Sequence, residues 1–387
     1  MHRSHYSRFL SANPNRLHFA AHSHHYWLDA TREAHLNYWD DSARLADKKW
    51  AHVFSTVVPK AQRHIARLID LSCPEQIAFA PNTHEFVVRL LSCFERLPIR
   101  ILTTDGEFHS FSRQIARLEE SGKAHVVRIP VEPFESFEDR FASAIERATC
   151  DLVFFSHVFF NSGFVVENLE RVVSAASSEQ TLVVIDGYHS FCAIPFSMKP
   201  IERRAFYLSG GYKYAQAGEG VCFLCVPKGC ALRPMNTGWF AEFGALSNRR
   251  VHDVAYASDG FRFFGATFDP SGLYRWNAVG DWLEAQNLSV AQIHDHAKRL
   301  QKRFLEKLSE ARLKWLTVER LVPPIHIKAR GNFLTFDVPN AEFIEAELSK
   351  LDVVIDRRGA RLRFGFGLYQ TEADIDALFE RLRRVAS

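Results

Sequence analysis

Between residues 60 and 226, short apolar runs alternate with amphipathic helical stretches, and this alternation most constrains how the chain can fold. Short continuous apolar runs are typical of strands that are buried on both faces of a sheet. The pattern therefore predicts an α/β domain with a mostly parallel sheet that helices cover on both sides. The expected strands are Ile99–Leu102, His125–Ile129, Leu152–Phe155, Thr181–Ile185, Ala205–Leu208 and Val221–Val226.

The pattern changes after about residue 275, where a long helical stretch at 288–313 precedes shorter strands and helices. Thr371 and Asp374 predict the N-cap of a final helix. Because 387 residues are many for one core, we expect two domains. The expected division is an N-terminal segment at 1–55 that lines the substrate mouth and packs on the small domain, a large α/β domain at 56–274, and a small α+β domain at 275–387.

Charge and composition exclude several classes of protein. The net charge is +3, from 48 basic and 45 acidic side chains that are interspersed, so no basic face for nucleic acid is expected. No apolar run approaches the length that crosses a bilayer, and the first residues lack the apolar segment of a signal peptide. Seven scattered cysteines favour reduced thiols, and Cys222 and Cys225 are interpreted as core side chains of a strand. We expect a cytoplasmic protein without nucleic-acid or membrane partners.

Two ionisable residues follow expected strands. Lys213 lies in a glycine-containing loop after Ala205–Leu208, and Asp186 ends the apolar run Thr181–Ile185. Alone, Lys213 would be interpreted as a solvated loop lysine and Asp186 as a turn cap. Together they suit pyridoxal 5'-phosphate, because a lysine amine can hold its aldehyde as a Schiff base and a carboxylate can keep its pyridine nitrogen protonated. His189 would then lie beside the ring.

Two further segments suit the same cofactor. Phe108 or His109 offers a flat surface on which a pyridine ring can stack, although core packing is the alternative for Phe108. Asn82, Thr83 and His84 lie at the expected start of a helix. The free backbone N–H groups of a helix N-terminus bind phosphate well, so we expect the phosphate group there.

The order of these residues resembles fold-type I pyridoxal-phosphate enzymes of the class V aminotransferase superfamily. Within it, the chain resembles kynureninase over about residues 76 to 370. The resemblance implies a fold-type I transferase fold and a homodimer whose chains share the cofactor sites. The motifs that carry it are Asp186-Gly-Tyr-His189, Tyr212-Lys213, Gly238-Trp239-Phe240, Phe261–Thr267, Ser156–Gly163 and Arg361–Tyr369.

The resemblance also implies roles for individual residues. Tyr212 and Trp239 would contact the cofactor phosphate, and Thr267 would reach the site of the partner chain. Arg363 would bind the α-carboxylate of the substrate, for which a planar guanidinium is well suited. Asn161, Ser162 and the loop with His22 and Ser23 would line the substrate site.

The sequence departs from kynureninase where substrate is recognised. Phe19–His25 replaces the L-D-G-N-S motif, and Phe108–Phe111 replaces F-P-T-D. The first of these segments contains three histidines, His22, His24 and His25, but no carboxylate or cysteine in ligand spacing. We therefore expect no metal site there.

The resemblance implies hydrolysis of a Cβ–Cγ bond in kynurenine or a related amino acid, giving alanine and an aromatic acid. Lys213, Asp186 and Tyr212 are the expected catalytic residues. The alternatives are a class V aminotransferase or another pyridoxal-phosphate-dependent β-lyase. A cysteine desulfurase is less favoured, because 322–333 contains no cysteine and Cys192 and Cys222 lie in apolar runs. Retention of Lys213 and Asp186 disfavours a non-catalytic protein.

Overall fold

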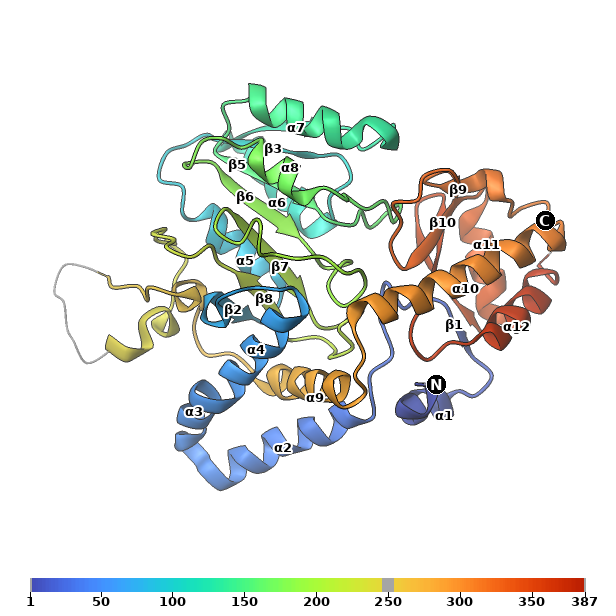
Figure 1. The fold of residues 1–387 in the computed structure, drawn as a ribbon, viewed down its shortest axis with the longest axis horizontal. Coiled ribbons are helices and arrows are strands. Elements are labelled where there is room, and N and C mark those ends of the chain that lie inside the picture. The colour runs from blue at the N-terminus through green and yellow to red at the C-terminus, as the bar shows by residue number, and fades with distance from the viewer. Residues whose placement is uncertain (1, 246–253, 386–387) are drawn as a thin grey trace.

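A computed structural model describes residues 2–245 and 254–385 of the chain. Figure 1 shows two lobes, a large one built on a seven-stranded sheet and a small one that contains the C-terminal strands and helices. Each lobe has its own extensive hydrophobic cluster. Among the described residues, no helix is both long and apolar enough to cross a membrane.

The sheet of the large lobe is mostly parallel, as predicted. Only β8 runs antiparallel to its neighbours β2 and β7. The sequence analysis did not identify β2, a four-residue strand at the sheet edge. The strands in sheet order are β2 (Ile77–Ala80), β8 (Cys222–Cys225), β7 (Ala205–Gly210), β6 (Leu182–Asp186), β5 (Leu152–Ser156), β3 (Ile99–Thr104) and β4 (Ala124–Ile129).

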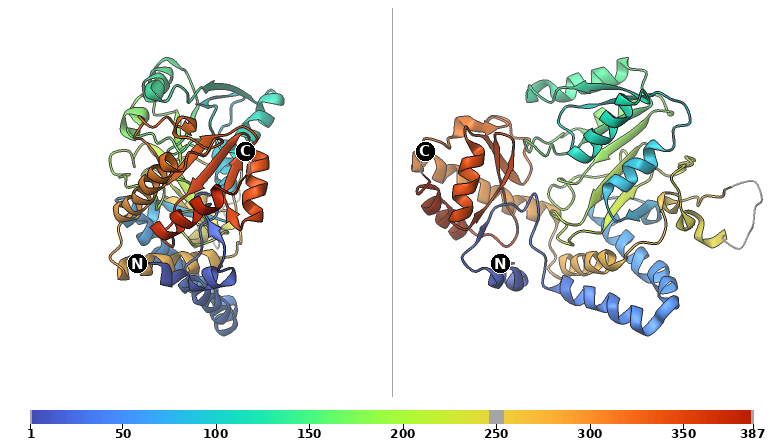
Figure 2. Two further views of the ribbon diagram at one scale, coloured as in Figure 1. Left: turned by 90° about the vertical axis from the view of Figure 1, so that its right-hand side faces the viewer. Right: turned by 180° about the vertical axis from the view of Figure 1, so that it is seen from behind.

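Helices cover both faces of this sheet. Helix α8 lies in front of it in Figure 1, whereas α5 and α6 lie in front when the molecule is seen from behind in Figure 2. The amphipathic stretches between the apolar runs form these helices, which confirms the predicted α/β arrangement. The helices of this lobe are α4 (Val58–Leu68), α5 (Thr83–Leu91), α6 (His109–Glu120), α7 (Phe137–Arg147), α8 (Leu169–Ser174) and α9 (Ser271–Ala285).

The small lobe contains a four-stranded antiparallel sheet in the order β12-β13-β10-β9. The predicted cap of the last helix is present, since Thr371 and Asp374 form a capping box. The elements of this lobe are α10 (Val290–Ala311), β9 (Leu321–Val322), β10 (Phe333–Asp337), α11 (Ala341–Lys350), β11 (Val353–Val354), β12 (Asp356–Arg358), β13 (Arg361–Gly365) and α12 (Glu372–Leu382).

The N-terminal segment contacts both lobes. It contains α1 (Ser7–Ala12), β1 (Leu17–His18), α2 (Ala30–Leu45) and α3 (Lys49–His52). Strand β1 pairs in parallel with β11 of the small lobe, whereas α2 packs against α9. Helix α9 spans the expected boundary at 274/275 and also packs against α4 of the large lobe. The division into domains stays a prediction.

Candidate active site

The carboxyl ends of the central strands bring the predicted reactive groups together. Asp186 is the last residue of β6, and its register partners are Ser156 at the end of β5 and Leu208 in β7. Lys213 follows β7 after a glycine pair. A Cβ atom at Gly210 would lie 2.3 Å from both the Tyr188 hydroxyl and the Cys222 sulfur, so the close packing at this strand end requires glycine.

A cavity of about 240 Å³ opens at these strand ends. Eight of the residues predicted from the sequence line this cavity, together with eight others. The predicted residues are Asn82, Thr83, His84, Phe108, Asp186, His189, Tyr212 and Lys213. The others are Pro81, Ser110, Ser156, Phe160, Tyr188, Glu219, Gly220 and Cys222.

The Lys213 amine is buried among aromatic rings. Its side chain is 4% exposed, and Nζ lies 2.9 Å from Nε2 of His189. Nζ also lies 4.7 Å from the ring centroid of Tyr188 and 5.3 Å from that of Phe108. Burial lowers the pKa of Lys213 to about 7, although the negative charge of Asp186 opposes this shift. At neutral pH, a substantial fraction of the amine is therefore uncharged and nucleophilic.

Asp186 provides a half-buried acceptor at the same strand ends. The backbone N–H of Tyr188 donates to its Oδ1 at 2.8 Å. Burial raises the pKa of this carboxyl, while the Tyr188 hydrogen bond and the Lys213 charge favour its ionised form. A protonated ring nitrogen placed beside Asp186 would add a further positive charge that favours the ionised carboxyl.

Glu107 organises the neighbouring strand ends, and the sequence analysis did not identify it. Its carboxyl accepts from the Thr104 hydroxyl at 2.6 Å and from the Ser156 hydroxyl and N–H at 2.7 and 3.1 Å. Burial raises the pKa of Glu107 to about 8. Because Glu107 joins the ends of β3 and β5, it fixes the position of the adjacent Phe108. The available signal was a charged residue three positions after the end of an apolar strand.

Phe108 lines the cavity, whereas His109 is exposed outside it. Phe108 is therefore the aromatic face available to a ring in the cavity. Helix α5 begins at the same cavity, where the Asn82 side chain accepts from the Glu85 N–H at 3.0 Å. The N–H groups of Thr83 and His84 belong to the first turn and suit an anionic group.

Trp239 and Thr267 do not line this cavity. The Trp239 indole N–H donates to the Thr267 hydroxyl at 3.2 Å, and both residues are exposed. Contact of either residue with a cofactor phosphate stays a prediction. This placement agrees with the expectation that Thr267 serves a partner chain, which stays a prediction.

Arg363 reaches toward the cavity from the small lobe. Its guanidinium carbon lies 5.9 Å from the ring centroid of Phe160 and 5.9 Å from that of Phe333. It donates to the backbone carbonyl of Phe160 and to Asp356. The positive charge of Arg363 lowers the pKa values of Lys213 and His189, so it acts on the same site.

The other residues expected around the substrate do not line the cavity. Ser162 is buried, and its hydroxyl accepts from the Phe164 N–H at 3.2 Å. The Asn161 carbonyl accepts from Arg361 at 3.3 Å. Ser23 is half-buried, with its hydroxyl 3.4 Å from the His24 ring. Their roles in substrate binding stay predictions.

The three histidines of the N-terminal loop have different neighbours. His22 stacks on Phe333 with 4.6 Å between centroids, and His24 stacks on Tyr212 at 5.1 Å. Nδ1 of His25 instead forms a hydrogen bond with the backbone carbonyl of Tyr26 at 2.6 Å. Within 2–245 and 254–385, no three histidine, cysteine or acidic side chains are grouped to hold a metal ion.

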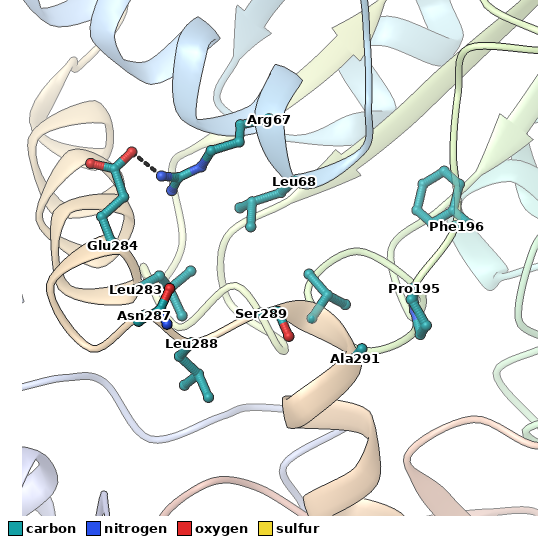
Figure 3. Close-up of a pocket in the computed structure, with 11 residues that line it drawn as sticks. Arg67, Leu68, Pro195, Phe196, Leu283, Glu284, Asn287, Leu288, Ser289 and Ala291 are labelled. Atoms are coloured by element: carbon teal, nitrogen blue, oxygen red, sulfur yellow. Dashed lines mark ion pairs between the residues drawn. The ribbon is translucent and has the colours of Figure 1, made fainter.

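A larger depression of about 540 Å³ lies elsewhere, between α4, α9 and α10 (Figure 3). Its walls include Leu68, Phe196 and Leu288, and an ion pair joins Arg67 to Glu284. Both charged side chains therefore have partners. The reactive lysine lies in the smaller cavity, which is the better candidate for chemistry.

The smaller cavity fits pyridoxal phosphate in each of its parts. It has a buried amine for the aldehyde, a carboxylate for the ring nitrogen, an aromatic face and a helix N-terminus for the phosphate. Together with the mostly parallel sheet, these features define a fold-type I pyridoxal-phosphate enzyme. The class-V aminotransferase family matches residues 21–342, and the chain belongs to this family.

More specific similarities are to sulfur-releasing enzymes. A probable cysteine desulfurase of Vibrio cholerae serotype O1 is 22% identical over 259 residues, covering 65% of this chain and 61% of the relative. The apo structure of a cysteine desulfurase from Thermococcus onnurineus NA1 matches with a TM-score of 0.78 at 18% identity, covering 96% of this chain and 94% of the other. A cystine C–S lyase in complex with its product, cysteine persulfide, matches with a TM-score of 0.79 at 16% identity, covering 97% and 99%. At such identities, the structural matches show the fold.

Proposed function

We propose that this protein is a pyridoxal-phosphate-dependent β-lyase that cleaves the Cβ–S bond of a cysteine-type amino acid. The proposal replaces kynurenine hydrolysis as the first choice, because the sequence relative and the structural neighbours are described as desulfurases or as a C–S lyase. The observation that carries the choice of a lyase is that the cavity holds a reactive amine but no reactive thiol.

All seven cysteines lie in the described part of the chain, and only Cys222 lines the cavity. Burial raises the pKa of the Cys222 thiol to about 12, so it stays protonated at neutral pH. Its sulfur also lies 3.5 Å from the Tyr188 hydroxyl, inside the core. The cavity therefore offers no thiolate to take sulfur onto the chain, and we expect the sulfur to leave in a small molecule.

Cleavage of the Cβ–S bond requires removal of the α-proton of the amino acid. The bound cofactor supplies an electron sink that makes the α-proton of the amino acid acidic. Lys213, as a neutral amine, accepts that proton, and the Cβ–S bond breaks with its electron pair passing to sulfur. For cystine, addition of one water then yields cysteine persulfide, pyruvate and ammonia. Phe108 and Phe160 wall the site and exclude bulk water.

The test is product analysis with purified protein that has been reconstituted with pyridoxal phosphate. Cysteine and cystine are supplied separately, and pyruvate, alanine and persulfide are measured. We expect pyruvate in amounts equal to the sulfur released, with activity retained in Cys222→Ser and lost in Lys213→Ala. Alanine as the product, with sulfur bound to a protein cysteine, would instead establish a desulfurase and refute the lyase.

Kynurenine hydrolysis is the second candidate. It is favoured by the similarity of Arg361–Tyr369 to kynureninase and by the aromatic wall that Phe108 and Phe160 form, with ring centroids 5.4 Å apart. Kynurenine and 3-hydroxykynurenine are therefore included in the substrate panel. Alanine together with an aromatic acid would favour this reaction over sulfur release, and conversion of the cofactor to its amine form would favour transamination.

We also propose that the enzyme works as a homodimer. The side chains of Met235 and Trp239 offer exposed apolar surface, and neither they nor Thr267, which Trp239 contacts, line the cavity of their own chain. A second copy would cover this surface and receive Thr267 near its own cofactor phosphate. Light scattering at micromolar concentration tests this proposal, and a monomeric mass would contradict it.

A further inference from the structure

Arg363, the residue expected to bind the substrate carboxylate, already has a carboxylate partner. Strands β12 and β13 are antiparallel, and their register places Asp356 directly opposite Arg363. Side chains of directly opposite residues lie on the same face of a sheet. The Arg363 guanidinium donates to Oδ2 of Asp356, and the side chains are only 2% and 10% exposed.

A second guanidinium shares the same carboxylate. Arg358 lies two residues after Asp356 in β12, so both side chains point to one face of the strand. Nη1 of Arg358 donates to Oδ1 of Asp356 at 2.7 Å. Each oxygen of Asp356 therefore bonds a different arginine, and two positive charges share one negative charge. Both arginines lower the pKa values of Lys213 and His189, which places their charges toward the reactive amine.

The guanidinium of Arg363 is enclosed, so another carboxylate can reach it only by displacing a neighbour. One amino group donates to the Phe160 carbonyl and the other to Asp356, while Nε is buried without a hydrogen-bond partner. The rings of Phe160 and Phe333 also lie close to the guanidinium. Carboxylates bind arginine best through two parallel N–H donors. An incoming carboxylate therefore competes with Asp356 for the same guanidinium.

We propose that Asp356 is an internal stand-in for the substrate carboxylate, and that the substrate displaces it from Arg363. Asp356 then keeps its hydrogen bond to Arg358. Arg358 is thus paired with Asp356, and Arg363 is paired with the substrate carboxylate. In the free enzyme, Asp356 neutralises the buried Arg363 guanidinium, because a buried charge without a partner would destabilise the fold. Nε2 of His22 lies 3.8 Å from Oδ2 of Asp356. Burial lowers the pKa of His22, so its ring is neutral and adds no positive charge that would compete for Asp356.

This exchange makes Asp356 a residue that determines specificity. A compound displaces Asp356 only if it carries a carboxylate that can reach Arg363 from the cavity, so simple amines are disfavoured. The inference rests on the proposed function for the identity of the ligand as an amino acid. The exchange itself involves only Asp356, the two arginines and a carboxylate ligand, so it can be measured without turnover.

The experiment compares wild-type protein with Asp356→Asn. Propionate is titrated into the apoprotein and followed by thermal unfolding, and glycine is titrated into the reconstituted enzyme and followed by cofactor absorbance. We expect both ligands to bind about tenfold more tightly to Asp356→Asn, because removal of a competitor raises the fraction of free Arg363. Binding of ethylamine, which lacks a carboxylate, is expected to stay unchanged. Asp337→Asn, an exposed carboxylate in the same sheet, is the matched control.

Arg358→Gln provides a second test that does not alter Asp356. We expect it to weaken propionate binding in the wild-type background, because the displaced Asp356 loses its remaining partner, but not in the Asp356→Asn background. A merely structural role for Asp356 predicts weaker binding in Asp356→Asn and additive effects in the double variant, and either result overturns the proposal. Absence of pyruvate from every sulfur substrate would refute the proposed function but would leave these propionate comparisons intact.

Discussion

The depressed pKa of Lys213 predicts how the apoprotein takes up its cofactor as pH changes. An ordinary lysine has a pKa near 10.5, whereas that of Lys213 is lowered to about 7. At pH 7, about half of the Lys213 amines are neutral, compared with roughly one in three thousand for an ordinary lysine. Only the neutral amine attacks an aldehyde. The rate of covalent uptake should therefore rise with pH up to about 7 and level off above it.

Rapid mixing of apoprotein with pyridoxal phosphate between pH 6 and pH 10, followed by absorbance, measures this profile. N-acetyl-lysine in the same buffers is the control, and its rate should continue to rise to about pH 10. Asp186→Asn removes a charge that raises the pKa of Lys213, so its profile should level off at lower pH than that of the wild type. A wild-type rate that follows N-acetyl-lysine up to pH 10 would refute the argument from burial.

Three further predictions concern the surroundings of this amine. Because burial raises the pKa of Glu107 from 4.5 to about 8, the wild type should lose stability relative to Glu107→Gln as pH rises through this interval, by an amount on the order of a few kcal/mol in urea unfolding. A Cβ atom at Gly187 would lie 1.9 Å from the Tyr207 ring, so Gly187→Ala should destabilise the protein by about 1–3 kcal/mol, and an unchanged urea midpoint would contradict this packing. If Thr267 serves a partner chain, Thr267→Ala should weaken cofactor binding without changing the mass measured by light scattering, and unchanged cofactor affinity would argue against that role.

The core of the site was predictable because its signals are local. Apolar runs predict strands, and polar residues directly after them predict groups at a sheet edge. Parallel packing of β6 beside β7 then brings Asp186 and Lys213 together. The N-terminal turn of α5 was predictable in the same way, since Asn82 caps it as its residue type suggests.

The rest depends on register and on packing between distant segments. The strand β12 contains only three residues, and nothing local shows that Asp356 lies opposite Arg363. Cys222 was interpreted as a core side chain and is buried, but the neighbouring Gly210 leaves it facing the cavity. Trp239 was assigned to the cofactor by resemblance, yet a single chain places it outside its own cavity.

Covalent trapping of the cofactor tests the central claim most directly. Protein incubated with pyridoxal phosphate is reduced with borohydride, digested and examined by mass spectrometry, with Lys213→Ala treated in parallel. We expect one phosphopyridoxyl group on the peptide that contains Lys213, and none on the corresponding peptide of the variant. A label on another lysine, or equal labelling of both proteins, would contradict the assignment of the active site.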